Sequence, residues 1–337
     1  ALLCFGLAHF VRIALLCFGL ACFVRIALLC FGLAYFVRIA LLCFGLAHFV
    51  RIALLCLFCF LKFIFGLNLW YIKFMRFKVV VFIFVLFFSF ISFAETAEDK
   101  GLRLATEAYT KNKGFVSQLS TSELILINAY GSEMNRKMSS TSIETKNDGD
   151  KVIIEFLWPA DVKGTKLLTW SHKTRDDDQW LFLPALNRVK RILSTSKSGS
   201  FMGSEFSYED VGSDEIEKYT YKFIQDDTVN ERPVWVYERY PTNEKSGYSK
   251  QIVYMDKEYL QPQKIEYFDR KKELLKISDF TNFKLYYLED KSKSFWFFHE
   301  IVVKNVQTKK SSILKWEDRK IGNKVSSTLF LKDNLLN

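Results

Sequence analysis

Short segments rich in aromatic and β-branched residues follow one another from residue 139 onward, and they restrict the chain to a β fold. Turn residues separate the segments, and no helical pattern alternates with them, which argues against a parallel α/β sheet. The segments are SSTSIETK (139–146), KVIIEFLW (151–158), TKLLTW (165–170), QWLFLP (179–184), YTYKFI (219–224), PVWVYERY (233–240), KQIVYM (250–255), QKIEYF (263–268), ELLKISDF (273–280), FWFFHEIVV (295–303) and SSILKWED (311–318). The sequence therefore predicts an antiparallel sandwich or barrel.

Aromatic side chains recur at every second residue in two of these segments, which places them on one face of a strand. Tyr219, Tyr221 and Phe223 share such a face, and so do Trp235 and Tyr237. Either these rings form an ordinary core, or they line a barrel cavity that holds one apolar ligand. The candidate wall residues are Trp170, Trp180, Phe182, Tyr221, Phe223, Trp235 and Tyr237.

A helix is predicted ahead of the strand series. Thr96 is a candidate N-cap with Asp99 three residues later, and Gly114 follows the predicted end. One face of this helix is expected to pack on an apolar surface, and it carries Leu102, Ala105 and Tyr109. Further on, the dipeptide Asp148–Gly149 predicts a two-residue hairpin between the first two strand segments.

The basic excess of the chain belongs to its first 94 residues. The 337 residues have a formal net charge of +10. Eight of the 47 Lys and Arg, and none of the 37 acidic residues, precede residue 95, which leaves 39 basic against 37 acidic residues in the rest. A nucleic-acid-binding surface needs basic residues concentrated in the folded part, so the charge gives no indication of one.

Residues 1–52 are four near copies of the unit ALLCFGLAHFVRI, which differ only at His9, Cys22, Tyr35 and His48. The Arg in each copy keeps the apolar runs below the roughly 20 residues that a spanning helix needs. The repeats are also shorter than solenoid repeats. They are either a membrane anchor or translated upstream sequence. Because no Met precedes Met75, we favour the second interpretation for residues 1–74 and place them outside the mature protein.

Residues 75–94 have the three parts of a secretory signal peptide. MRFK (75–78) is a short basic region, VVVFIFVLFF (79–88) is apolar, and small residues stand at Ser92 and Ala94. Cleavage after Ala94 is expected to release residues 95–337. The exported part has no cysteine, so it needs no disulfide and offers no site for a lipid anchor. All the cysteines of the chain precede residue 60: Cys4, Cys17, Cys22, Cys30, Cys43, Cys56 and Cys59.

The exported part lacks the patterns of common catalytic and metal sites. His172 and His299 are its two histidines, and no zinc-type spacing joins them. Asp176–Asp178 lacks the spaced ligands of an EF-hand loop, so we interpret it as a solvated hairpin tip. Neither a G-x-S-x-G elbow nor a phosphate-binding glycine loop occurs. No metal, cofactor or enzymatic activity is predicted. A Ser-His-Asp group assembled in space leaves a lipid esterase as a remote alternative.

A compact motif, FMGSEFSYEDV (201–211), follows the segment LPALNRVKRI (183–192). Both resemble the periplasmic LolA-like outer-membrane lipoprotein-sorting proteins, in particular the branch found alongside RND-type exporters. That branch reads LPAL-R-VRRI and then FMGSDFSYEDL. This chain departs from it conservatively at Lys190, Glu205 and Val211. The resemblance covers residues 95–337, including 248–276 and 301–318.

The resemblance implies that residues 95–337 form an unclosed antiparallel β-barrel, a LolA-like half-barrel, with helices covering an apolar cavity. It also implies a carrier in the periplasm of a Gram-negative bacterium, which binds the acyl chains of a lipoprotein or lipid and moves them from the inner towards the outer membrane. The motif would form a moving lid or a fixed plug through Phe201, Met202, Gly203, Phe206, Tyr208, Glu209 and Asp210. The candidate partners of its acids are Arg188, Lys190 and Arg191.

A second function is compatible with the same sequence. The protein would then be a non-enzymatic accessory that docks on an RND-type exporter of the inner membrane and presents a substrate to it. A co-purifying acyl chain with no partner favours the carrier, whereas a neighbouring exporter gene favours the accessory. The sequence specifies neither the cargo nor the oligomeric state.

Overall fold

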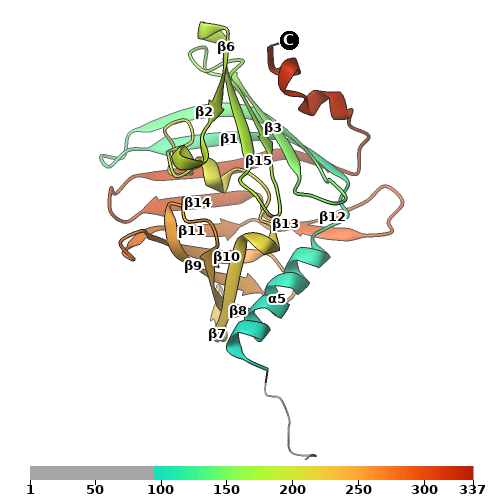
Figure 1. Cartoon of the computed structure of the whole chain (residues 1–337), viewed down its shortest axis with the longest axis vertical. Coiled ribbons are helices and arrows are strands. Elements are labelled where there is room, and N and C mark those ends of the chain that lie inside the picture. The colour runs from blue at the N-terminus through green and yellow to red at the C-terminus, as the bar shows by residue number, and fades with distance from the viewer. Residues whose placement is uncertain (1–94, 337) are drawn as a thin grey trace, which may run out of the picture. The chain divides into compact units, whose positions relative to one another are not determined.

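The computed structural model describes residues 95–336, so the predicted repeats and signal peptide lie outside the described residues. A single antiparallel sheet of 13 strands dominates this part of the chain (Figure 1), in the order β6-β5-β4-β3-β2-β1-β15-β14-β11-β10-β9-β8-β7. The remaining strands, β12 and β13, form a separate hairpin. Since the two end strands of the large sheet do not pair with each other, the predicted unclosed antiparallel barrel is confirmed.

The bounds of the elements agree with most of the predicted segments. The strands are β1 (Ser117–Ile127), β2 (Glu133–Ile143), β3 (Lys151–Trp158), β4 (Lys166–Trp170), β5 (Asp178–Leu183), β6 (Arg188–Ile192), β7 (Tyr219–Val229), β8 (Arg232–Pro241), β9 (Tyr248–Asp256), β10 (Pro262–Asp269), β11 (Leu274–Thr281), β12 (Lys284–Tyr287), β13 (Ser294–Phe297), β14 (Glu300–Asn305) and β15 (Ser311–Ile321). The helix is α5 (Ala97–Lys111), and short 3₁₀ turns are η2 (Pro184–Leu186), η3 (Ser194–Ser196), η4 (Tyr208–Asp210), η5 (Ile216–Lys218), η6 (Ser327–Phe330) and η7 (Lys332–Leu336).

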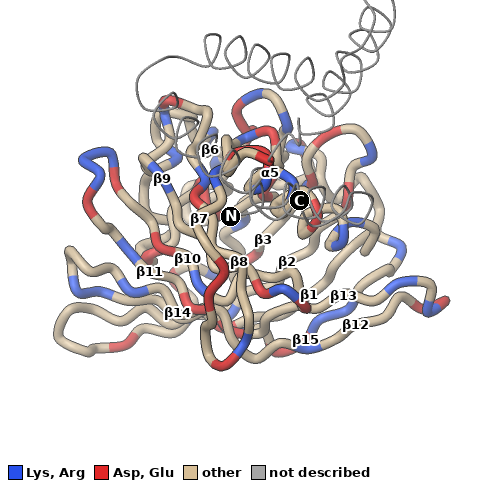
Figure 2. The backbone as a smooth tube through the Cα atoms, turned by 90° about the horizontal axis from the view of Figure 1, so that it is seen from below, with Lys and Arg blue, Asp and Glu red and all other residues tan. Residues whose placement is uncertain are grey.

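Helix α5 begins as predicted and lies on the concave side of the sheet (Figure 2). The Thr96 hydroxyl accepts a hydrogen bond from the backbone N–H of Asp99, which satisfies one of the free donors of the first turn. The predicted apolar face was partly wrong, because Leu102 is 45% exposed. The buried face instead consists of Gly101, Leu104, Ala105 and Ala108. Within residues 95–336, no helix is long and apolar enough to cross a membrane.

The edges of the sheet are consecutive in the chain. Strand β6 ends one edge and β7 ends the other, and residues 193–218 connect them across the opening. Ionic contacts also bridge this opening and join the two arms of the sheet, of which one ends at β6 and the other at β7. The Asp177 carboxylate lies 2.9 Å from Lys218 Nζ, and that of Asp176 lies 3.1 Å from Lys245 Nζ. The barrel is therefore completed by a connecting segment and side chains rather than by strand pairing.

Apolar side chains form three clusters, two of them on the concave face. The helix-side cluster packs below α5 and includes Ala105, Ala108, Tyr221, Tyr237, Tyr248, Val253, Met255, Leu260, Ile265, Tyr267, Phe280, Ile301 and Val303. The motif-side cluster comprises Leu124, Met138, Ile154, Phe156, Val162, Leu167, Leu181 and Phe201. The outer cluster, on the opposite face, comprises Ile153, Leu168, Trp180, Phe182, Phe330 and Leu335, so the C-terminal turns cover that side.

Two local predictions require correction. Strands β2 and β3 do form a hairpin, but Ile143 pairs with Lys151, so the loop runs over residues 144–150 instead of the two residues Asp148–Gly149. Contacts with another part of the fold hold Asp148 away from a two-residue turn, because its carboxylate accepts hydrogen bonds from His172 and from the backbone N–H of Lys173. The predicted strand 295–303 divides at Phe298 and His299 into β13 and β14.

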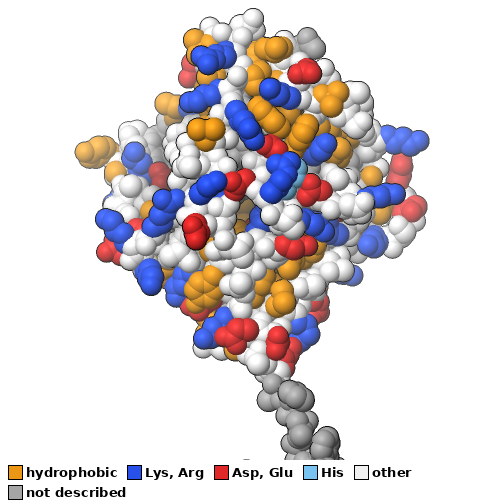
Figure 3. Space-filling model, in the orientation of Figure 1, with side chains coloured by type: hydrophobic (Ala, Val, Ile, Leu, Met, Phe, Trp, Pro, Cys, Tyr) orange, Lys and Arg blue, Asp and Glu red, His pale blue; other side chains and the backbone are white. Residues whose placement is uncertain are grey.

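The surface of the described part carries mixed charges. On the face drawn in Figure 3, Lys and Arg side chains are scattered among Asp and Glu and do not gather in one large patch. This distribution agrees with the near balance of 39 basic and 37 acidic residues after residue 94. The basic excess of the chain thus lies in residues 1–94.

Gly101 allows α5 to lie close to β7, and its replacement tests this contact. A Cβ at this position would lie 2.7 Å from the backbone N of Phe223 and 2.9 Å from the carbonyl C of Lys222. We expect Gly101→Ala to lower the free energy of unfolding by about 1–3 kcal/mol through overpacking, despite the better helix propensity of Ala. Urea denaturation measures this, with Thr106→Ala on the exposed face as the control, which should stabilise slightly or change nothing.

Candidate ligand-binding interior

The motif 201–211 inserts its rings into the concave interior. Phe201 is only 3% exposed, and its ring lies 5.8 Å from those of Phe156 and Tyr208. Phe206 contacts both the helix-side and the motif-side clusters, so it lies between them. Met202 and Val211 add partly buried contacts to the motif-side cluster. The motif therefore fills part of the concave interior with its own side chains.

A tight turn brings these rings inward. The backbone N–H of Phe201 donates to the carbonyl of Phe206 at 2.7 Å, and that of Ser204 donates to the carbonyl of Phe201 at 3.0 Å. Between them, Met202 and Gly203 have φ values of +51° and +80°. Glycine adopts such a backbone without steric cost, which explains its position in the motif. The buried guanidinium of Arg136 donates to the Met202 carbonyl and holds the turn against β2.

Lys276 anchors the motif from the opposite wall. This lysine of β11 is 3% exposed, and its Nζ lies 2.6 Å from Asp210 Oδ2 and 2.8 Å from the Glu205 carbonyl. The Tyr248 hydroxyl donates to Asp210 Oδ1 at 2.8 Å, and the Asn305 amide donates to Glu205 Oε2 at 2.7 Å. A charged lysine inside an apolar barrel requires such a partner, because desolvating it alone would cost several kcal/mol.

The predicted pairing of the motif acids with β6 was wrong. Arg191 contacts Asp178, and within residues 95–336 no ion pair involves Arg188 or Lys190, which are both exposed. The motif turns inward across the opening, so its acids reach β9, β11 and β14 instead of the strand that precedes it. Sequence proximity was a poor guide here because the connecting segment crosses the whole opening.

Glu209 lies at the join between the two arms. Its carboxylate accepts hydrogen bonds from Ser246 Oγ at 2.9 Å and from the Gly247 backbone N–H at 2.8 Å, in the turn between β8 and β9. Burial, and next the negative charge of Asp210, raise the pKa of the Glu209 carboxyl above its ordinary value. The contact is therefore sensitive to the protonation of a carboxyl.

Asp176–Asp178 is not the solvated tip that the sequence predicts. Asp178 is buried and lies within 2.8 Å of Arg175 and 2.5 Å of Arg191, and its Oδ2 lies 3.3 Å from His172 Nε2. Asp177 pairs with Lys218, and Asp176 contacts Asn243 and Lys245. Burial raises the pKa of Asp176, but hydrogen bonds from Ser194, Lys245 and Asn243 outweigh this and bring it to about 2. Asp176 and Asp177 therefore link the two arms, whereas Asp178 ties the turn before β5 to β6.

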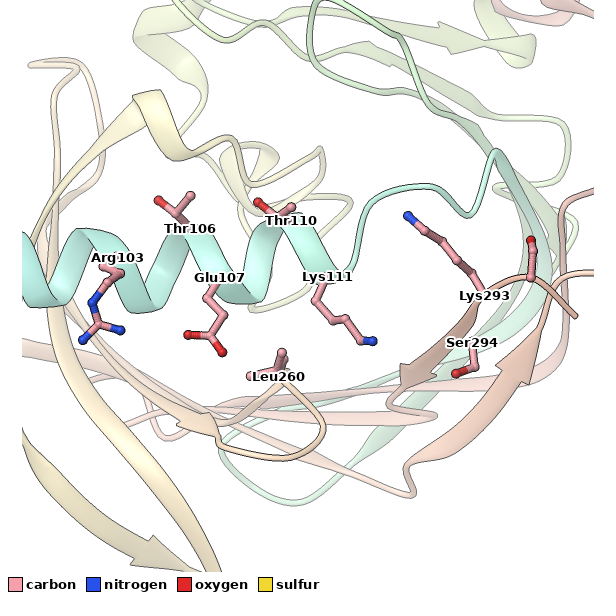
Figure 4. Close-up of a pocket in the computed structure, with 9 residues that line it drawn as sticks. Arg103, Thr106, Glu107, Thr110, Lys111, Leu260, Lys293 and Ser294 are labelled. Carbon is pink, nitrogen blue, oxygen red and sulfur yellow. The ribbon is translucent and has the colours of Figure 1, made fainter.

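A groove runs beside α5 on the concave side, as Figure 4 shows. Its volume is about 710 Å³, within the range of small-molecule sites. The walls come from α5, from the turn after β9 and from the segment that leads into β13: Arg103, Thr106, Glu107, Thr110, Lys111, Leu260, Ser292, Lys293 and Ser294. Leu260 also belongs to the helix-side cluster, so the groove has a polar rim and reaches the apolar interior.

The predicted cavity wall is divided between the two faces of the sheet. Tyr221, Tyr237 and the partly buried Trp235 belong to the helix-side cluster, and Phe223 lies under Lys100 of α5, whose Nζ is 3.5 Å from the ring centroid. The other three predicted residues are wrong as cavity wall, because they lie in or against the outer cluster: Trp170, Trp180 and Phe182. Trp170 donates its indole N–H to the carbonyl of Phe330, so these rings bind the C-terminal turns.

Several residues of the interior were not identified from the sequence. Lys276 shares strand parity with Ser278 and Phe280, so alternation alone would have placed it on the buried face. Leu260 lies in a turn with a φ of +53°, and no sequence pattern marks it. Arg136 is the one basic side chain of β2 at a buried position, and burial lowers the pKa of its guanidinium.

The hydrogen bonds of the two histidines lead to groups other than serine. His172 Nδ1 contacts Asp148, and His299 contacts the Tyr286 hydroxyl at 2.7 Å and the Trp316 carbonyl at 3.1 Å. Burial lowers the pKa of His299. Both side chains therefore have structural partners in the described residues.

An unclosed antiparallel barrel with an apolar interior defines a class of protein, and comparisons identify its family. The structure superposes with a TM-score of 0.68 on a domain named for outer membrane lipoprotein sorting from Vibrio parahaemolyticus, at 43% identity over 71% of this chain and 100% of that one. A DUF1329 family protein from Desulfovibrio piger superposes with a TM-score of 0.66, at 26% identity over 71% of this chain and 99% of that one. A LolA superfamily protein from Nitrosomonas europaea, at 17% identity over 72% of this chain and 100% of that one, has a TM-score of 0.54 and shows the shared fold.

A family model that is described only as an uncharacterized protein matches residues 148–337. No curated protein matches the chain. On the identity and coverage of the Vibrio domain, this chain belongs to the family of outer-membrane lipoprotein-sorting proteins, and it shares its fold with the LolA superfamily protein. The resemblance of the motif 201–211 to lipoprotein-sorting proteins is thereby confirmed, whereas the assignment to the branch found alongside RND-type exporters stays a prediction.

Removing Lys276 tests whether the charge pair holds the motif in the interior. We expect Lys276→Met to lower the free energy of unfolding by about 3–5 kcal/mol, because Asp210 is left charged and without its cation. The motif should also open more often. A Ser204→Cys reporter, buried and unique after residue 94, should react faster with a maleimide in the Lys276→Met background. Lys190→Met is the control and should leave both measurements unchanged.

Glu209 predicts a pH dependence of stability. Because its pKa in the folded state lies above that of the unfolded chain, its stabilisation is complete below the unfolded pKa and is lost as the pH rises through the folded pKa. Glu209→Gln keeps a neutral side chain at every pH, so it should be more stable than the native protein at pH 7. The difference should shrink as the pH falls through the raised pKa. Denaturant titrations at pH 7 and pH 4.5 measure it, and an equal difference at both would contradict this origin.

Proposed function

We propose that residues 95–337 form a periplasmic carrier that holds the acyl chains of a lipoprotein or lipid inside the unclosed barrel. The observation that carries this proposal is the insertion of two rings of the motif into the concave interior: Phe201 lies within the motif-side cluster, and Phe206 lies between that cluster and the helix-side cluster. A loop that fills an apolar interior with its own rings stands where an acyl chain would bind. Each buried CH₂ contributes about 0.8 kcal/mol, so such a chain needs no polar recognition.

The anchoring of the motif supports a lid that moves. Its rings are held by directional polar contacts, namely those of Lys276 with Asp210 and of Glu209 with Gly247. A few such contacts can break and re-form together, whereas an entirely apolar plug would lose its burial gradually. The opening between β6 and β7 lets the segment swing outward without unpairing any strand.

The groove beside α5 supplies a route from the surface to the interior. Its rim carries Arg103, Lys111 and Lys293, which suit the anionic or polar end of a cargo, and Leu260 connects it to the helix-side cluster. Membership of the lipoprotein-sorting family supports the same substrate class. Transport from the inner towards the outer membrane, cleavage of the signal after Ala94 and a non-enzymatic role belong to this proposal.

Native mass spectrometry with lipid extraction tests the carrier function. We expect the protein, after export to a bacterial periplasm, to retain an extractable acyl species. Leu260→Asn should lower the retained amount, because it makes the floor of the groove polar while Asn tolerates the left-handed backbone at this position. Lys272→Asn is the matched control, because it places Asn at another position of positive φ (+66°) in an exposed turn outside the groove, and it should retain the native amount.

A single apo mass that stays unchanged after incubation with phospholipids and lipopeptides would contradict a carrier. In that case the accessory of an RND-type exporter becomes the better function, and the motif becomes a fixed plug. The Ser204→Cys reporter separates lid from plug in the same samples. Its labelling should change when an acyl ligand is added if the motif moves, and should stay constant if it does not.

A further inference from the structure

Strand β6 is a free edge of the sheet. It ends the strand order, and its only sheet neighbour in the described residues is β5. The other edge, β7, is covered differently, because Gly101 of α5 lies against the backbone of Phe223. An edge strand presents a row of backbone donors and acceptors that can pair with a further strand. The β6 edge of the large sheet is therefore open to strand addition.

The side chains of β6 give this edge a distinct charge. Arg188 and Lys190 pair across the ladder with Leu183 and Leu181, so both stand on the concave side of the sheet at its lip. Both are exposed, and no ion pair within residues 95–336 uses them. Leu186 and Leu193, at the two ends of the strand, are 68% and 60% exposed. In Figures 1 and 3, basic and hydrophobic side chains mix at the end of the molecule where β6 lies.

We propose that β6 binds an extended acidic segment of a partner protein by strand addition. Backbone hydrogen bonds would supply affinity, and alternate side chains would supply specificity. Facing Arg188 and Lys190, the partner needs acidic residues at every second position over about five residues, the length of β6. Apolar residues at its two ends would cover Leu186 and Leu193.

Charge complementarity distinguishes this partner from the alternatives within the chain. Residues 1–94 contain no Asp or Glu and therefore cannot supply the acids. A second copy of β6, added antiparallel about Lys190, would place Lys190 opposite its own copy, and like charges directly opposite are destabilising. The cations thus disfavour self-association through this edge while they favour a foreign acidic strand. This inference does not rest on acyl binding by the interior.

A pair of designed peptides tests the inference. The probe is a seven-residue peptide of alternating valine and glutamate, and its counterpart carries lysine in place of glutamate. We expect the protein, purified after export, to bind only the acidic peptide in fluorescence anisotropy, more weakly at high salt. The peptide should shift the backbone amide resonances of residues 188–192. The charge-reversed variant Arg188→Glu/Lys190→Glu should lose about tenfold in affinity for the acidic peptide and gain affinity for the basic one.

Lys222→Glu on the opposite edge strand is the control, and it should bind as the native protein does. The inference fails if the native protein binds neither peptide, or if the charge-reversed variant, folded by circular dichroism, keeps the native preference. It also fails if the native protein ignores the peptides but binds phosphatidylglycerol vesicles through Arg188 and Lys190, because β6 would then recognise a lipid surface. Acyl retention by the same preparations reports on the carrier function separately.

Discussion

A large sheet whose end strands do not pair must cover its concave face by other means, and this constraint organises the molecule. The inner positions of the sheet carry apolar side chains, which cannot face water without a large loss of stability. Two segments cover them: α5 on one side and residues 193–218 on the other. Phe206 lies where the two covers meet. The interior is thus closed by parts that are not members of the sheet.

Different interactions hold helix α5 and the motif 201–211 against the sheet. Helix α5 is held by close packing of Gly101, Ala105 and Ala108, whose small side chains leave little distance between helix and sheet. The motif is held by buried polar contacts at Lys276, Arg136 and Glu209. Close packing resists displacement of α5 along its whole length, whereas the attachment of the motif depends on a few polar contacts. The motif is accordingly the better candidate for the part that yields to a ligand.

The alternation of apolar and polar residues predicted most strands well, because one face of each strand packs on the core and the other does not. The same logic failed where the partner of a residue is distant. Asp176–Asp178 looks like a polar turn, and only the folded chain brings Lys218 and Lys245 to it. Trp170 and Trp180 looked like cavity wall, because a sequence does not show that the C-terminal turns cover the other face. Strand β1 contains no aromatic residue and was not predicted, although it lies near the centre of the sheet.

That central position of β1 has a consequence for biogenesis. Leu124 of β1 pairs with Leu314 of β15, so the two halves of the sheet join through contacts between residues far apart in the sequence. Proteins dominated by such non-local contacts fold slowly, because loop closure precedes the gain from pairing. Until β15 has been released, β1 lacks one of its two neighbours and the sheet stays in two pieces. Such a chain remains open for longer, which suits the export that we propose for it.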